Sequence, residues 1–348
     1  FCFNSFDSYK NHLKLKSKSP FTMKFKIATL LFCSAFAFGQ NIQNNPTSNH
    51  GNKFEQLGTI LPTANIYRTG SGAPGQGYWQ NRADYDITAF LDEDKRNLRG
   101  SETITYYNNS PDDLEYIWLQ LDENEHSSLK DAGYDDGTKL PKMITTDRLK
   151  TTELPVKDNG YGVNLEKVRD DSGLPLQFVV NKTMMRIDLP KVLKKGEKFT
   201  FKIDWNYKFP NRMVMGGRGG YENFREDGND LYTITQWYPR MCVYSDFKGW
   251  QTNQFTGRGE FALVFGNFKV SMNVPADHIV AGTGVGKNYE QVLTSAQLSR
   301  WKQAQNSNEP VEIVTLEEAK KAEKSKSKDR KIWKFEAENV RDFAWTSS

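Results

Sequence analysis

Alternation of apolar and polar residues is the clearest pattern in the first structured part of the chain. Asp84–Leu91 alternates, and Leu98–Tyr107 alternates again after the turn-forming residues Asp92–Asn97. Successive side chains of a strand point to opposite faces, so alternation indicates strands with one buried face. The two segments therefore predict a β-hairpin, and Leu114–Leu121 predicts a third strand.

The same pattern recurs along most of the chain. Further strands are expected at Leu176–Val180, Met184–Leu189, Lys198–Phe209, Leu231–Gln236, Gly259–Phe265, Ile279–Thr283, Lys331–Phe335 and Arg341–Trp345. Phe261–Val274 is consistent with one long strand or two broken ones. Many strands joined by short turns, with 13% aromatic residues, indicate a mainly β fold of antiparallel sheets rather than βαβ units.

One or two short helices are expected beside the sheets. Ser295–Ala304 carries apolar residues at helical spacing, and Thr294 precedes it as a side-chain cap. Glu317–Lys331 is highly charged and is expected to be a helix or a loop. Asp122–Asp158 is polar and acidic, which predicts an inserted loop.

The first 77 residues carry targeting and linker patterns. Residues 1–22 precede Met23 and are expected to be an upstream extension that is not translated. Met23–Gly39 joins a short basic region to an apolar run of about twelve residues, typical of a secretory signal helix and too short to span a membrane. Cleavage before Gln40 would leave residues 40–77 as a disordered linker. The protein is therefore expected to be secreted or periplasmic, with no stable membrane span after cleavage.

The net charge of +4 comes from the amino-terminal residues. Residues 1–39 hold six of the 47 basic residues and one of the 43 acidic residues, so the rest of the chain has 41 basic and 42 acidic residues. A nearly neutral body gives no electrostatic basis for binding nucleic acid or acidic lipid. The basic run Lys320–Lys331 lacks aromatic residues and contains Glu323, which indicates a solvated face.

Cys242 is the one cysteine that remains after residue 39. The processed chain can therefore form no internal disulfide, and its stability must come from its core. A lone cysteine of this kind is expected to be a small buried apolar residue.

Binding chemistry is expected in the stretch Leu231–Gly266. Its first strand stops at Trp237-Tyr238-Pro239, because proline fixes φ, removes a donor and restricts the residue before it. The connection to the next strand holds aromatic residues, charged residues and glycines. Binding sites commonly lie where a strand runs out into such a loop. From the pattern alone, an aromatic-lined hairpin with a long connection remains an alternative.

Four ordered motifs resemble the N-terminal domain of aminopeptidase-N-like zinc metallopeptidases: Thr235–Arg240, Gly259–Phe261, Val274–Asp277 and Ala337–Trp345. The resemblance extends over roughly residues 78–348. It implies a saddle-shaped antiparallel β domain over residues 78–340. It also implies that residues 341–348 begin a catalytic domain whose remainder lies beyond the sequence.

By this resemblance, Gln236, Trp237 and Tyr238 form one wall of a peptide-binding cleft. In the family, a Thr-Gln-aromatic-X segment ends a strand at the active-site rim, and X helps to hold the free amino group of the substrate. X is usually Glu or Gln there and is Tyr238 here, a phenol that is neutral at pH 7. The bond after X is often cis in the family, so a cis Tyr238–Pro239 bond that turns the hydroxyl into the cleft is expected.

The full-length enzyme implied by the resemblance would use zinc to hydrolyse peptide bonds at the N-termini of peptides, with the catalytic domain as the partner of this one. Such peptidases hold zinc with His-Glu-x-x-His on one helix. None of the four histidines, His12, His50, His126 and His278, is followed by Glu. The sequence therefore predicts no catalytic residue and no metal site in this chain, which alone is expected to be inactive.

A non-catalytic secreted β module that binds carbohydrate or protein remains an alternative. Its candidate binding platform would be formed by tryptophans: Trp118, Trp205, Trp250, Trp301 and Trp333. Trp118 and Trp205 lie within strand patterns, where burial is the usual outcome.

Two glycine-rich segments fit no nucleotide-binding motif. Gly282–Lys287 lacks the first glycine and the final hydroxyl residue of a phosphate loop, so a strand-terminating turn is expected. Gly216–Gly220 lacks the strand-then-helix setting of a dinucleotide site. It is expected to be a surface loop near the mouth of the cleft.

Overall fold

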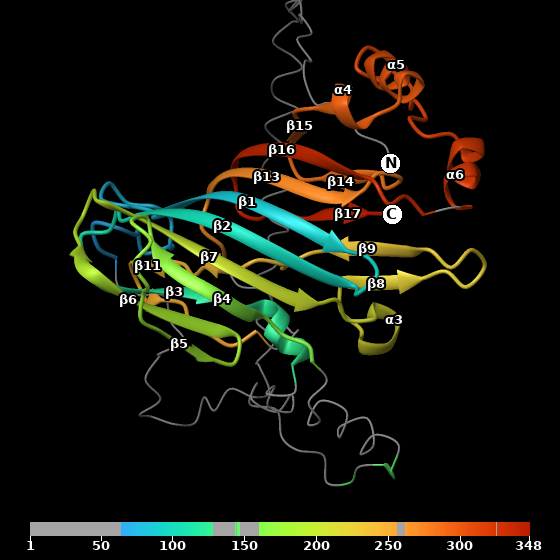
Figure 1. Cartoon of the computed structure of the whole chain (residues 1–348). Coiled ribbons are helices and arrows are strands. Elements are labelled where there is room, and N and C mark those ends of the chain that lie inside the picture. The colour runs from blue at the N-terminus through green and yellow to red at the C-terminus, as the bar shows by residue number, and fades with distance from the viewer. Residues whose placement is uncertain (1–63, 128–142, 144, 147–159, 256–261, 325) are drawn as a thin grey trace, which may run out of the picture.

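The computed structural model describes residues 64–127, 143, 145–146, 160–255, 262–324 and 326–348. Strands dominate this part of the chain, and short helices lie at its margins (Figure 1). The mainly β fold expected from the alternation is confirmed. The expected signal helix, Met23–Gly39, lies outside the described residues, and the saddle shape stays a prediction.

Seven strands form the largest sheet, in the order β15-β16-β13-β1-β2-β7-β4. Their bounds are β1 Arg82–Asp92, β2 Asn97–Tyr107, β4 Asn164–Asp170, β7 Lys198–Lys208, β13 Gly266–Pro275, β15 Val285–Gly286 and β16 Arg330–Val340. β1 and β2 pair along their whole length, which confirms the expected hairpin.

One strand pair in this sheet departs from the expected antiparallel arrangement. β1 and β13 run parallel, whereas their other pairings in the sheet are antiparallel. A parallel pair needs a long crossover connection. The chain provides one, because it builds most of the remaining strands between β1 and β13.

Three smaller sheets complete the described fold. The first has the order β10-β3-β6-β5, with bounds β3 Leu114–Gln120, β5 Phe178–Asn181, β6 Met184–Leu193 and β10 Arg240–Met241. The second has the order β14-β17-β9-β8, with bounds β8 Gly220–Asn223, β9 Asp230–Ile234, β14 Val280–Gly282 and β17 Trp345–Ser347. The third is the pair β11 Tyr244–Ser245 and β12 Gly249–Trp250.

One hydrophobic core joins these sheets. Trp237, which follows β9, is fully buried. Its ring meets Trp205 of β7 and Trp345 of β17 in edge contacts, with ring centroids 5.8 and 5.9 Å apart. The large sheet and the β9–β17 sheet are therefore packed together at the end of β9.

The helices are short, and three of them, α3, α5 and α6, begin at side-chain caps. Their bounds are η1 Asp122–His126, α3 Arg212–Met215, α4 Tyr289–Val292, α5 Ser295–Ala304 and α6 Leu316–Ala322. Thr294 caps α5 as expected and forms a full capping box with Gln297. Thr315 and Glu318 form a second capping box at α6. The helix within Glu317–Lys331 therefore covers only the first part of that segment.

The strand expected at Gly259–Phe265 does not form in its described part. Leu263 makes an isolated bridge to Cys242, and the ladder of β13 begins only at Gly266. A side chain on Gly266 would place its Cβ 1.5 Å from the Ala83 carbonyl oxygen. The chain can therefore enter the sheet beside β1 only where it has a glycine.

The last strand begins four residues later than the expected Arg341–Trp345. Asp342 and Phe343 are held by side chains of the β9 end instead of a strand partner. β17 then pairs with β9 and β14. Residues 345–347, which the resemblance gave to a following domain, are thus integrated into the β body.

Residues 64–77 are the described end of the expected linker. Arg68 forms a two-pronged ion pair with Asp246, with its Nε 2.8 Å and its Nη2 2.9 Å from the carboxylate oxygens. This end of the linker is therefore attached to the body, and residues 40–63 lie outside the described part. Within the described residues, no helix has the length and apolar character needed to cross a membrane.

Candidate functional site

The chain turns sharply where β9 ends. Ile234 is the last residue of the strand, and Gln236 has a φ of 56°, in the left-handed region. A residue other than glycine is strained there, and such strain is often found at functional positions. After this turn Trp237 and Tyr238 enter the core, where they are 0% and 3% exposed.

A cavity of about 230 Å³ lies beside Gln236, and we call it the Gln236 cavity. It is lined by Gln120, Arg218, Thr235, Gln236, Arg240, Phe255, Leu263, Asp342 and Ala344. The Gln236 side-chain amide makes no hydrogen bond to any other residue in the described chain. Its donor and acceptor are therefore open to a ligand.

A buried arginine organises the charged groups at this cavity. Arg240 is 5% exposed and donates to Asp342 at 2.7 Å and to Gln120 at 3.3 Å, and it forms an ion pair with Asp122. Burial raises the pKa of Asp122 to about 6, although the positive charge of Arg240 acts in the opposite direction. Asp342 is the more accessible acid, because its side chain is 33% exposed.

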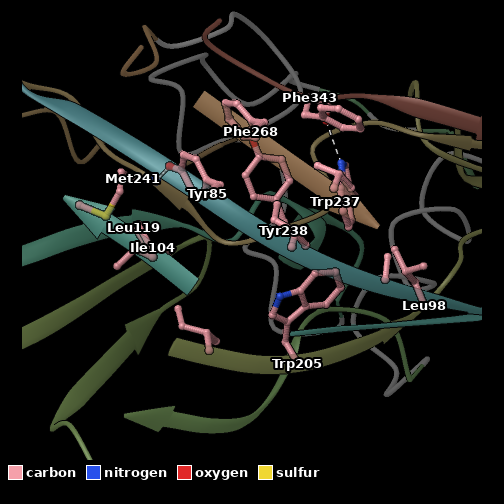
Figure 2. Close-up of a cluster of buried hydrophobic side chains, with 14 of the residues drawn as sticks. Tyr85, Leu98, Ile104, Leu119, Trp205, Trp237, Tyr238, Met241, Phe268 and Phe343 are labelled. Carbon is pink, nitrogen blue, oxygen red and sulfur yellow. Dashed lines mark hydrogen bonds between the residues drawn. The ribbon is translucent and has the colours of Figure 1, made fainter. Parts of the chain in front are cut away.

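The two aromatic residues of the motif fix the segment that follows them in space. The Trp237 indole nitrogen donates to the Phe343 carbonyl at 2.8 Å, as Figure 2 shows. The Tyr238 hydroxyl donates to Asp342 at 2.8 Å. Burial raises the pKa of Tyr238 well above its ordinary value, so the phenol stays neutral. Trp237 and Tyr238 therefore lie behind the cavity wall, whereas Gln236 lines the cavity itself.

The expectation of a cis Tyr238–Pro239 bond is wrong, because the bond is trans. Trans is the lower-energy isomer for a bond before proline. In this arrangement the Tyr238 hydroxyl is directed to Asp342 inside the protein and does not turn into the cleft.

Two further buried acids, Glu102 and Glu123, lie in the core and were not predicted from the sequence. Glu102 on β2 is 1% exposed, and both its carboxylate oxygens lack hydrogen-bond partners within the described residues. Glu123 on η1 is 6% exposed. Burial raises the pKa of both groups well above the ordinary value. The sequence signal was an acid at an inward position of an alternating strand, seen at Glu102.

The variant Glu102→Gln should lose part of the pH dependence of stability. A group whose pKa is raised in the folded state stabilises the fold at pH values below its ordinary pKa. That stabilisation is lost as the pH rises towards the folded-state pKa. Above about pH 4.3, wild-type stability should fall more steeply than that of the variant, by about 1.4 kcal/mol per pH unit. Urea unfolding from pH 4 to 9 measures this slope.

The exposed Glu115 on β3 provides the control, since Glu115→Gln should follow the wild-type curve. Parallel curves for wild type and Glu102→Gln would show that Glu102 is ionised in the folded protein.

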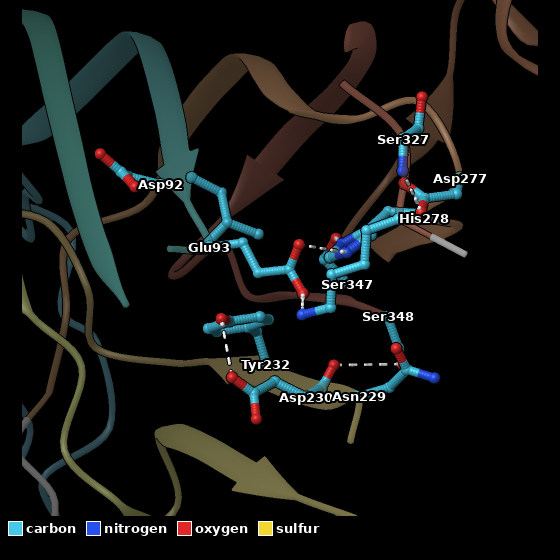
Figure 3. Close-up of polar contacts among 12 residues, drawn as sticks. Asp92, Glu93, Asn229, Asp230, Tyr232, Asp277, His278, Ser327, Ser347 and Ser348 are labelled. Atoms are coloured by element: carbon cyan, nitrogen blue, oxygen red, sulfur yellow. Dashed lines mark hydrogen bonds and ion pairs between the residues drawn. The ribbon is translucent and has the colours of Figure 1, made fainter. Parts of the chain in front are cut away.

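The described histidines lie in different parts of the molecule. His278 is buried, with Nδ1 2.8 Å from the Ser347 hydroxyl and Nε2 3.9 Å from Glu93, whose carboxylate also pairs with Lys326 at 2.6 Å (Figure 3). Burial lowers the pKa of His278, although Glu93 opposes this shift. His126 lies beside Gly217. Among the described residues no three His, Cys, Asp or Glu gather in a way that could hold a metal ion, so these residues do not fit a zinc site.

Other expected features can be placed relative to the cavity. Arg218 from the glycine-rich segment Gly216–Gly220 lines the Gln236 cavity, so this segment reaches the end of β9. Cys242 is buried, as expected for a lone cysteine. Trp205 is buried, and Trp118 is partly buried. The described tryptophans therefore do not form a single exposed platform at these positions.

Comparisons with known proteins found similar structures but no similar sequences. No family model matches the chain, and no curated protein matches it. Its structural neighbours are M1 zinc metallopeptidases. The M1 zinc metallopeptidase from Deinococcus radiodurans, as a mutant bound to a Tyr-Ser-Ala substrate, has a TM-score of 0.39 and 13% identity, covering 77% of this chain and 42% of that one.

Two further structures are similar to the same degree. The D. radiodurans enzyme without the mutation gives a TM-score of 0.38 and 13% identity, over 79% of this chain and 43% of that one. A two-domain M1 zinc metallopeptidase mutant bound to L-tryptophan gives a TM-score of 0.38 and 12% identity, covering 79% of this chain and 44% of that one. The chain therefore spans less than half the length of these proteins. Likeness at such TM-scores carries no inference about its activity.

Proposed function

We propose that this chain is the N-terminal domain of a secreted zinc-dependent aminopeptidase and forms one wall of its peptide-binding cleft. The Gln236 cavity would receive the amino end of the peptide. Zinc and the general base would belong to a catalytic domain that follows in the full-length enzyme. The chain by itself would then be inactive, and its saddle-shaped body would close one side of the cleft.

The observation that carries this proposal is the strained turn at Gln236. The turn leaves one polar side chain, without a partner in the described chain, in a cavity at the end of a strand. Preorganised polar groups in concave sites orient ligands, and strained backbone is retained where the surroundings hold it. Here Trp237 and Tyr238 hold it, through Phe343 and Asp342.

Two of the motifs that suggested the resemblance are in direct contact. Thr235–Arg240 and Ala337–Trp345 are about one hundred residues apart in the sequence, and three hydrogen bonds link them. The two segments therefore build one structure. This contact is what the proposal would require if both motifs serve the same cleft.

Asp342 would supply the negative charge that Tyr238 lacks. Its carboxylate lines the cavity, is one third exposed, and accepts from Tyr238 and Arg240 on its two oxygens. A carboxylate oxygen has two acceptor positions. Oδ1 already accepts from the Tyr238 hydroxyl and from the Phe343 N–H at 2.9 Å, so Oδ2 is the oxygen that can still receive a donor from a ligand. A free ammonium group could thus be bound by Oδ2 of Asp342 and the Gln236 amide oxygen.

Binding of small amines tests this proposal on the chain itself. We expect L-leucinamide to bind more tightly than N-acetyl-L-leucinamide in titrations followed by ligand-observed NMR, because acetylation removes the charged donor. The variant Gln236→Ala should weaken L-leucinamide binding about tenfold or more, since a hydrogen bond to a charged group is lost.

The matched control is Gln177→Ala, because Gln177 is exposed on a different part of the body. It should leave the affinity unchanged, and Asp342→Asn should remove the preference for the free amine. Equal binding of the free and acetylated amides, or full affinity in Gln236→Ala, would rule out an amine site at this cavity.

A further inference from the structure

A second cavity, of about 370 Å³, shares Leu263 with the Gln236 cavity and none of its other lining residues. Its walls come from residues 78–81, from residues 243–251 around β11 and β12, and from residues 262–265 with Arg341. We call it the aromatic cavity. Its volume lies in the range of about 300–1,000 Å³ that is usual for small-molecule sites.

Aromatic rings form much of its lining. Trp79 stacks on Tyr244, with ring centroids 5.9 Å apart and an angle of 26° between the rings. Tyr78, Phe247 and Phe265 line the cavity as well, and Phe247 is 56% exposed. A planar ring could therefore stack or make edge contacts with several walls at once.

The charges in the aromatic cavity leave one positive charge unbalanced. Arg68 and Asp246 neutralise each other in their two-pronged pair. Arg341 lies with its guanidinium 4.6 Å from the centre of the Phe265 ring. In the described chain no carboxylate forms an ion pair with Arg341, whose side chain is exposed.

Trp79, which lines the cavity, also carries a buried donor without a partner in the described chain. Its indole nitrogen is buried and has no hydrogen-bond partner within the described residues. Indole nitrogen can only donate, and so can guanidinium. The Arg341 guanidinium, which has no carboxylate partner in the described chain, would therefore be matched by acceptor oxygens on a ligand.

We propose that the aromatic cavity binds a planar aromatic ring that carries a carboxylate. The ring would lie among Trp79, Phe247 and Phe265, and the carboxylate would pair with Arg341. The guanidinium fork matches the two oxygens of a carboxylate, and its contact with Phe265 holds it in place. This inference does not depend on the proposed peptidase function.

Three probes separate the contributions of ring and charge. The probes are 3-phenylpropionate, its neutral analogue 3-phenylpropionamide, and hexanoate, which keeps the carboxylate but lacks the ring. Affinities come from calorimetric titration of the full chain. The location comes from the fluorine NMR signal of Trp79 in protein labelled with 5-fluorotryptophan, assigned with Trp79→Phe.

We expect 3-phenylpropionate to bind, to shift the Trp79 signal, and to bind about tenfold or more tightly than either analogue. Arg341→Gln should reduce its affinity to that of the amide. The matched control is Arg99→Gln, because Arg99 is also exposed and lies 4.7 Å from the Phe90 ring elsewhere on the surface. It should leave the affinity unchanged.

Four results of these titrations would contradict binding of an aromatic carboxylate in this cavity. Equal affinity for acid and amide, equal effects of Arg341→Gln and Arg99→Gln, an unmoved Trp79 signal, or no binding of 3-phenylpropionate would each overturn it. None of these results bears on leucinamide binding at the Gln236 cavity, so the two proposals can fail separately.

Discussion

Replacing Arg240 with methionine is expected to lower the free energy of unfolding by about 3–5 kcal/mol, because it leaves a buried acid without its cation. Asp122 is 3% exposed and depends on Arg240 for its ion pair. Asp342 should be affected less, since its side chain is one third exposed and water can solvate it. Urea unfolding at pH 7 measures the loss.

The pH dependence of this loss has a defined sign. The pKa of Asp122 is already raised to about 6, and removal of Arg240 raises it further. A raised folded-state pKa destabilises the fold as the pH rises through it. The difference between Arg240→Met and wild type should therefore grow as the pH increases above about 6 and shrink in acid.

Two comparisons make the Arg240 result interpretable. Arg186→Met removes an arginine from a surface pair with Asp188, in which the side chains are 43% and 54% exposed, and should change stability by at most about 1 kcal/mol. The double variant Asp122→Asn, Arg240→Met should regain part of the loss, because the unpaired charge is gone. A loss below about 1 kcal/mol for Arg240→Met alone would show that the buried pair does not hold this region together.

Trp237→Ala is expected to destabilise the protein by about 3–5 kcal/mol, the range for large-to-small changes at buried aromatic positions. Trp237 is fully buried, and its ring contacts Trp205 and Trp345 from two different sheets. The change also removes the donor to the Phe343 carbonyl. Both losses act on the junction between the sheets.

The variant Trp237→Phe separates packing from hydrogen bonding. It keeps a ring but has no donor, so its loss should be smaller than that of Trp237→Ala. The exposed strand residue Val179 supplies a control, because Val179→Ala removes little buried surface. An unchanged urea midpoint for Trp237→Ala, together with lost leucinamide binding, would mean that Trp237 faces the ligand rather than the core.

Local signals allowed much of the fold to be predicted. The β1–β2 hairpin follows from two alternating segments and a polar turn, and its register is complete. The Thr294 cap of α5 depends on residues within one helical turn. Such features are determined by neighbours in the sequence, and for that reason a pattern can identify them.

Long-range contacts could not be predicted in the same way. The parallel pairing of β1 and β13 joins residues about 180 positions apart, and no local pattern specifies it. β4 was missed because it is an edge strand in which only Val168 is buried, so apolar alternation is absent. Edge strands commonly lack a buried face.

At the candidate site, too, local features could be predicted and long-range contacts could not. Gln236 was singled out by the resemblance of its segment, Thr235–Arg240, where the strand pattern stops before Pro239. The link from Tyr238 to Asp342 spans 104 residues and reversed the expected direction of the Tyr238 hydroxyl. Burial of three consecutive residues, Trp237 to Pro239, cannot follow from a period-two pattern, because both faces of the segment are covered.

The most direct test of the central claim is to sequence the native transcript past the codon for Ser348. If this chain is the cleft wall of a zinc aminopeptidase, the reading frame continues and encodes His-Glu-x-x-His on a predicted helix within a few hundred codons. A stop codon directly after Ser348 in the native transcript would contradict the account and favour a secreted β module without its own chemistry.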